Sequence, residues 1–173
     1  MAARTTDPVN RVFDAGGGED QRTRVLMVDD DVEEHLLVAV AAQDQLHPPV
    51  FEFVTSGEEL LLRLTAVTAE GDLPDLILLD FQMHGMGSLR TLEQLQADPV
   101  LWQIPVVVVT DTFRIEDEVA CYQRGATRFE DRPRTVGAMI DFVSKLLRFA
   151  RRSQHSLPSS LKSQRFGTES STN

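Results

Sequence analysis

Residues 24–31 read Arg24-Val25-Leu26-Met27-Val28-Asp29-Asp30-Asp31, a short apolar run followed directly by three carboxylates. Further apolar runs occur along the chain, and each is too short for a helix and rich in β-branched residues, leucine or phenylalanine: residues 50–54, 76–79 and 106–109. Such runs are typical of strands that are buried on both faces of a parallel sheet. A weaker fifth candidate covers residues 126–130.

Helix-length segments separate these candidate strands. Ser56 stands three residues before Glu59, which is the spacing of a capping box at a helix start. Helices are also predicted over 88–97 and over 112–124, where Gly125 is a suitable residue to follow the helix end. Including a last helix from about residue 135 to 151, the five strand–helix pairs predict an α/β fold. It is a doubly wound five-stranded parallel sheet with helices on both faces.

The last predicted helix carries apolar residues on more than one side. One set has helical spacing and predicts a stripe against the core: Val136, Ile140, Val143 and Leu147. A second set points to another side of the helix: Phe142, Leu146 and Phe149. This second set indicates either wider contact with the core or an apolar surface for a homodimer. Both interpretations remain open from the sequence.

The composition predicts one domain flanked by polar ends. Of the 173 residues, 42% are hydrophobic and 25% are charged, which is typical of a soluble globular chain. Residues 1–22 are polar and form a predicted flexible leader, and residues 151–173 form a predicted disordered tail. The whole chain has a net charge of −10, of which the leader carries −1 and the tail +3, so the domain at 23–150 carries −12.

The same numbers exclude several classes of protein. Cys121 is the only cysteine, so no intrachain disulfide framework or multi-cysteine zinc site is expected. No apolar stretch reaches the ~18 residues of a membrane span, and the N-terminus lacks the apolar core of a signal peptide. The negative charge argues against binding to nucleic acid, whose phosphates select basic surfaces. We therefore expect a cytoplasmic protein without a membrane or nucleic-acid partner.

Polar side chains follow four of the predicted strands. The first strand is followed by the aspartates 29–31, the third by Asp80, the fourth by Thr110 and the fifth by Arg132. In open α/β sheets, functional residues gather at the carboxyl ends of the strands. Clustered carboxylates repel one another unless a cation neutralises them, and such oxygen ligands suit Mg²⁺. An aspartate neutralised in this way could attack a phosphoryl group, with the hydroxyl and the cation binding the phosphoryl oxygens. The simpler alternative, an aspartate that caps the following helix, explains Asp31 alone.

The motifs around these residues resemble the receiver domain of two-component response regulators. The resemblance covers residues 23–150 in order and spacing, and it rests on the segments 25–31, 78–83, 105–110 and 125–129. It implies a flavodoxin-like three-layer sandwich with strand order 2-1-3-4-5. It also implies a phosphoprotein of the phosphorelay type whose partner is a histidine kinase, and not an enzyme.

The resemblance implies a role for each site residue. Asp80 would be the phosphoacceptor, and Mg²⁺ would be held by Asp29, Asp30, Asp80 and the backbone carbonyl of Gln82. Thr110 and Arg132 would bind the phosphoryl group, and Thr110 with Phe129 would form the switch that alters partner binding. The downstream partner is not implied.

Three positions depart from the family pattern. Arg132 stands where the family has a lysine, and its planar guanidinium differs from a compact ammonium group. Asp111 stands where a small residue is usual and adds negative charge beside the phosphoryl group. Both changes predict slow phosphorylation. His84 replaces a proline, and we expect it to be a solvent-exposed loop residue.

A narrower resemblance concerns the small response regulators that are paired with phytochrome-type histidine kinases. It rests on the segments 98–105 and 121–125 and on a long connection over 65–74. It fits a stand-alone receiver, since 22 residues follow residue 151. One alternative is a degenerate receiver that acts as a binding or dimerisation module without phosphorylation. A second alternative is an aspartyl phosphohydrolase, whose D-x-D motif residues 29–31 match, but no length remains for the catalytic cap of such an enzyme.

Overall fold

The computed structural model describes residues 22–70 and 73–155. Its centre is one parallel sheet with strand order β2-β1-β3-β4-β5, which confirms the predicted topology. The strands are β1 (Arg24–Val28), β2 (Val50–Val54), β3 (Leu76–Asp80), β4 (Val106–Thr110) and β5 (Arg128–Asp131). Only β5 is displaced, since it begins two residues later than predicted.

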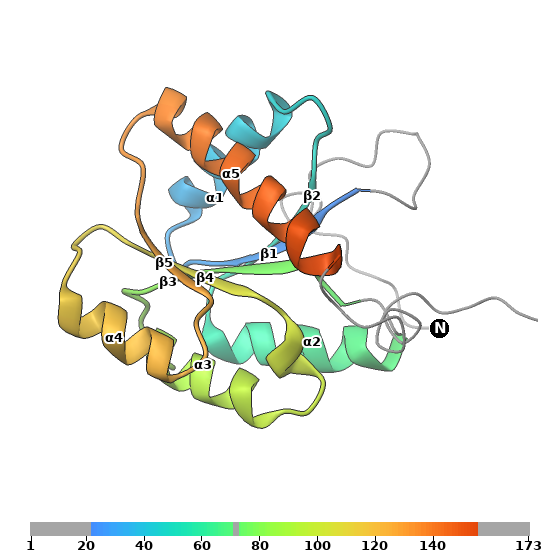
Figure 1. The fold of residues 1–173 in the computed structure, drawn as a ribbon, viewed down its shortest axis with the longest axis vertical. Helices are drawn as coiled ribbons and strands as arrows, with labels where there is room; N and C mark the ends of the chain where they lie inside the picture. Colours follow the sequence, from blue (N-terminus) through green and yellow to red (C-terminus); the bar gives the residue numbers. More distant parts are fainter. Residues whose placement is uncertain (1–21, 71–72, 156–173) are drawn as a thin grey trace, which may run out of the picture.

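Helices cover both faces of the sheet, as Figure 1 shows. On one face lie α1 (Val32–Gln43) and α5 (Val136–His155); on the other lie α2 (Gly57–Glu70), α3 (Ser88–Ala97) and α4 (Ile115–Gln123). A short 3-10 helix, η1 (Leu101–Gln103), follows α3. The result is a three-layer sandwich in which every strand is followed by a helix.

The two faces of the sheet bury two separate sets of side chains. On β1, Val25 and Met27 contact α1 and α5, whereas Leu26 and Val28 contact the other helix layer. Every residue of β3 and β4 is buried. Because neighbouring side chains on a strand point to opposite faces, a nearly continuous apolar run is the pattern that a sheet covered on both sides requires. Each fully buried side chain of this kind contributes about 1.5–3 kcal/mol to stability.

Local signals define where the helices begin and end. The Asp31 carboxylate accepts a hydrogen bond from the Glu33 N–H at 2.9 Å and caps α1. The Ser56 hydroxyl accepts from the Glu59 N–H at 3.1 Å at the start of α2. Gly125 ends α4 with a φ of +91°, a conformation that glycine adopts without strain. These three positions confirm the capping signals that the sequence predicted.

Two predicted boundaries are corrected. The last helix continues to His155, so residues 151–155 belong to α5 and not to the tail. Helix α2 continues to Glu70, so the predicted connection over 65–74 is largely helical. The predicted leader (1–22), apart from its last residue, and the rest of the tail (156–173) lie outside the described residues. Among the described helices, none combines the length and apolar character that crossing a membrane requires.

The second apolar set on α5 makes wider contact with the core, which is one of the two predicted interpretations. Phe142 and Leu146 are buried in the core, and Phe149 packs against it while the Arg128 guanidinium lies 5.1 Å from its ring centre. Val136, predicted to face the core, is exposed. The second set on α5 therefore makes core contacts, and the homodimer prediction loses the surface on which it rested.

Candidate functional site

Backbone hydrogen bonds bring the predicted site residues to one edge of the sheet. The Asp29 N–H donates to the Val54 carbonyl at 3.1 Å, and the Arg132 N–H donates to the Thr110 carbonyl at 2.8 Å. Each bond continues the ladder one residue past a strand end. Since all five strands are parallel, Asp29, Asp80, Thr110 and Arg132 must lie at the same edge.

Three carboxylates form a compact cluster at this edge. Asp29, Asp30 and Asp80 each offer one oxygen, and these oxygens lie within 4.8 Å of one another. Asp29 and Asp80 are buried, and Asp29 Oδ2 has no hydrogen-bond partner. Three carboxylates this close together repel one another, and a single neighbouring cation does not balance their combined charge. The cluster therefore fits a hard divalent ion such as Mg²⁺, as predicted.

Arg132 supplies a positive charge to the same cluster. Its Nη2 donates a hydrogen bond to Asp80 Oδ1 at 2.5 Å and lies 2.8 Å from Asp29 Oδ2. Its other nitrogens contact Glu34 at 3.2 Å and Asp111 at 3.1 Å. Burial lowers the pKa of Arg132, but the charges of Asp29, Asp80 and Glu34 together raise it above its usual value. The guanidinium is thus a permanent cation among four carboxylates.

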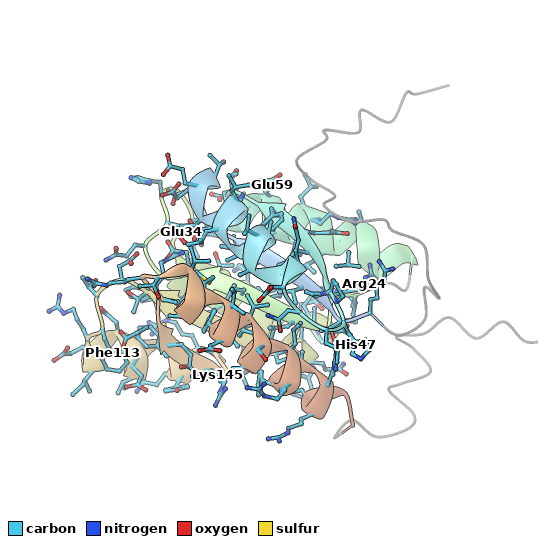
Figure 2. The ribbon with its side chains drawn as sticks, turned by 90° about the horizontal axis from the view of Figure 1, so that it is seen from above. Arg24, Glu34, His47, Glu59, Phe113 and Lys145 are labelled. Atoms are coloured by element: carbon cyan, nitrogen blue, oxygen red, sulfur yellow. The ribbon has the colours of Figure 1, made fainter. Side chains whose placement is uncertain are left out.

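Glu34 was missed by the sequence analysis. It lies in the first turn of α1, next to the Asp31 cap, and Figure 2 labels it near the start of α5. An acidic side chain in the first turn is explained well enough by the helix dipole. The structure shows that Glu34 also forms an ion pair with Arg132, which lies just ahead of α5.

Asp80 combines burial with opposing charges. Burial raises the pKa of Asp80 to about 6, against the lowering effect of the Arg132 charge and with the help of the Asp29 charge. Its Oδ2 accepts the Gln82 N–H at 3.0 Å. At neutral pH this carboxylate is therefore mostly ionised but poorly solvated. Such a group is a suitable nucleophile for phosphorus once neighbouring cations reduce the repulsion.

The predicted switch residues, Thr110 and Phe129, contact the segments that follow β3 and β4. The Thr110 hydroxyl is buried and donates to the Thr112 carbonyl at 3.2 Å. Phe129 is buried on β5 and packs edge-on against Phe81 and Phe113, with ring centres 5.8 and 5.5 Å apart. The Gln82 side chain donates to the Thr112 hydroxyl at 2.9 Å. These residues lie together, while their roles in metal binding and switching remain predictions.

His84 is exposed, as predicted, but it also contacts the acidic cluster. Its side chain is 97% exposed, yet its backbone N–H and ring Nδ1 both approach Asp30 Oδ2, at 3.2 and 2.5 Å. The hydrogen bond to His84 lowers the pKa of Asp30, and the same bond raises the pKa of His84. A proline at this position could make neither contact.

Comparisons with known proteins agree on one family. The sequence model described as the response regulator receiver domain matches residues 25–144. The response regulator PleD of Caulobacter vibrioides is 31% identical over 126 residues, which are 73% of this chain and 26% of PleD. The DNA-binding transcriptional regulator NtrC of Salmonella typhimurium is 31% identical over 129 residues, which are 73% of this chain and 25% of NtrC. The chain therefore spans about a quarter of the length of these relatives.

Solved structures show the same fold. The phosphorylated cyanobacterial phytochrome response regulator RcpA superposes with a TM-score of 0.68 at 22% identity, covering 76% of this chain and 95% of RcpA. The Mn²⁺-bound response regulator Rcp1 gives 0.63 at 21% identity, covering 72% of this chain and 91% of Rcp1. At these identities the likeness concerns the fold alone.

Proposed function

Because this chain belongs to the family of response regulator receiver domains, we propose that Asp80 accepts a phosphoryl group from the phosphohistidine of a histidine kinase. The observation that carries the proposal is the placement of Asp80, which is buried beside Asp29 and Asp30 and in contact with Arg132. Receiver domains of this family are signalling modules, and we propose signalling, not enzymatic turnover, as the role of this chain.

The transfer itself needs little covalent chemistry from the protein. A carboxylate oxygen of Asp80 forms a bond to phosphorus while the phosphorus–nitrogen bond of the donor breaks, and the released imidazole takes up a proton. Mg²⁺, held by Asp29, Asp30, Asp80 and Gln82, would neutralise charge on the transferred oxygens. Arg132, whose Nη2 contacts Asp80 before the reaction, would supply further positive charge near those oxygens.

Phosphorylation would act on the rest of the protein through Thr110 and the packed rings of Phe113 and Phe129. The Thr110 hydroxyl now donates to the Thr112 carbonyl, and a phosphoryl oxygen on Asp80 would compete for that donor. Loss of this bond frees the loop that carries Phe113, which packs on Phe129 just before α4. The proposed output is therefore a change in the start of α4, and with it a change in partner binding.

An exposed apolar face on α1 supports docking of the phosphodonor. Val32, Leu36 and Val40 are exposed and spaced four residues apart, so they share one side of the helix. This side begins at the loop that holds the acidic cluster, where a donor histidine must approach. The donor we propose is a phytochrome-type kinase in the cytoplasm, on the strength of the resemblance carried by the segments 98–105 and 121–125.

The alternative is a receiver that binds partners without phosphorylation. It is favoured by one observation, the contact of Arg132 with both Asp29 and Asp80, which offsets part of the negative charge of the pocket without a metal ion. Phosphorylation of Asp80 would exclude this alternative.

The test is incubation with acetyl phosphate and millimolar Mg²⁺, followed by intact-mass measurement. Wild type should gain one phosphoryl group, and Asp80→Asn should gain none. Asp75→Asn is the matched control, because Asp75 is also a buried aspartate of the β3 region but bonds the Arg24 N–H at the opposite edge of the sheet. It should be modified like wild type. A wild-type protein that stays unmodified with acetyl phosphate and with kinase donors would refute the proposal.

A further inference from the structure

The guanidinium of Arg132 lies against two of the three carboxylates that form the possible metal site. Its Nη2 lies 2.8 Å from Asp29 Oδ2 and 2.5 Å from Asp80 Oδ1. Asp29 and Asp80 are also two of the three carboxylates whose oxygens converge to form the possible metal site. A divalent ion and a guanidinium nitrogen repel each other strongly at contact distance. Both cannot lie between Asp29 and Asp80 at once.

The contacts of Arg132 divide into a deep end and a shallow end. At the deep end, the side chains of Asp29 and Asp80 are 2% and 6% exposed. At the shallow end, Glu34 and Asp111 are 26% and 53% exposed. A guanidinium that withdrew from the deep end would therefore move toward more hydrated carboxylates that it already contacts.

At the shallow end, Arg132 forms close ion pairs that lack hydrogen-bond geometry. Asp29 Oδ2, Glu34 Oε2 and Arg132 Nε are all buried and have no hydrogen-bond partner, although each takes part in a close ion pair. Only the bond from Nη2 to Asp80 Oδ1 has hydrogen-bond geometry among these contacts. A small movement could give Nε and Nη1 hydrogen bonds to Asp111 and Glu34 that they now lack.

We infer that Arg132 and the divalent ion compete for Asp29 and Asp80, and that Glu34 and Asp111 hold the guanidinium when the ion displaces it. Glu34 and Asp111 are then positioning residues: they touch neither the metal ion nor the phosphoryl group and act through Arg132. This inference rests on the metal site of the proposed function, but it does not require phosphoryl transfer.

The test is a mutant cycle measured by calorimetric titration with Mg²⁺. Arg132→Gln should tighten Mg²⁺ binding by about tenfold or more, because it removes a competing unit charge from contact distance. The pair Glu34→Gln and Asp111→Asn should weaken Mg²⁺ binding by about tenfold when Arg132 is present, and by no more than about threefold in the Arg132→Gln background. Loss of two negative charges alone would weaken binding equally in both backgrounds.

Matched controls separate the effect of contact with Arg132 from the effect of losing two negative charges. Glu33→Gln removes the neighbouring exposed carboxylate of α1, and Asp131→Asn removes an exposed carboxylate at the end of β5. Neither residue forms an ion pair with Arg132 among the described contacts, so this control pair should behave alike in the two backgrounds. Circular dichroism would check that each variant is folded.

A second measurement uses the wild-type protein and needs no folded Arg132 variant. The side-chain Nε–H signal of Arg132 in a ¹⁵N correlation spectrum should shift on saturation with Mg²⁺, and Asp111→Asn should remove that shift. An unchanged signal, an Arg132→Gln affinity equal to wild type, or equal losses in both backgrounds would each overturn the inference. Absence of Mg²⁺ binding in every variant would also overturn it. A failure of Asp80 to accept a phosphoryl group would leave these binding constants as they are, so the two failures are distinguishable.

Discussion

Replacing Asp80 with asparagine should change how the stability of the protein depends on pH. Burial, supported by the Asp29 charge, raises the pKa of Asp80 to about 6 in the folded state, against 3.8 for the free side chain. Between these two values the folded state binds more protons at Asp80 than the unfolded state does. Stability from this group is therefore complete below the unfolded pKa and is lost as the pH rises through about 6.

The size of the effect follows from the pKa difference. A difference of about two units corresponds to roughly 3 kcal/mol, at about 1.4 kcal/mol per unit. Asparagine cannot ionise, so the Asp80→Asn variant does not lose this free energy. Its free energy of unfolding, relative to wild type, should rise by roughly 3 kcal/mol between about pH 4 and about pH 8.

Urea unfolding followed by circular dichroism, in EDTA at several pH values, measures this difference. The urea dependence should be the same for both proteins, so that the midpoints report stability. Asp141→Asn removes an exposed carboxylate of α5 and measures the effect of losing one negative charge alone. A stability difference between Asp80→Asn and wild type that is flat with pH, or that falls as the pH rises, would refute the burial argument.

Three further substitutions test the surface, the core and a turn. Leu36→Glu should slow phosphorylation by a kinase while leaving the reaction with acetyl phosphate unchanged, since Leu36 is exposed on α1; equal slowing with both donors would place the effect in the pocket. Phe142→Asp should lower the free energy of unfolding by several kcal/mol, because it buries an unpaired charge. A variant that stays equally stable and only changes from dimer to monomer in light scattering would show that Phe142 lies on the surface. Gly125→Ala should lower the free energy of unfolding by about 1–3 kcal/mol in thermal unfolding, because its φ is +91°, a conformation that alanine adopts only with strain; an unchanged melting temperature would show that the turn relaxes.

The strand pattern made the fold predictable from the sequence. Apolar runs such as 76–79 and 106–109 have no polar side, and only a sheet covered by helices on both faces buries them completely. Because parallel strands end at the same edge of a sheet, the positions of Asp29, Asp80 and Arg132 after their strands predicted that they lie together. Local chemistry was equally readable at Asp31 and Gly125, where a cap and a turn each require a particular residue type.

Contacts between distant segments were not predictable in the same way. Glu34 and His84 look like ordinary exposed residues of a helix start and a loop, and only the fold brings them to Arg132 and Asp30. The outer residues of α5 were ambiguous because the width of a buried helix face depends on how the helix is seated on the sheet. Phe142 is buried and Val136 is exposed for that reason.

The central claim is that Asp80 carries the phosphoryl group, and mapping the modified residue tests it directly. Borohydride reduces an aspartyl phosphate to homoserine, which peptide mass spectrometry locates in the sequence. After reaction with a phosphodonor and Mg²⁺, we predict homoserine at position 80 and unmodified aspartate at 29 and 30. Homoserine at position 29 or 30, or none at position 80 despite a phosphoryl group on the intact protein, would contradict the account.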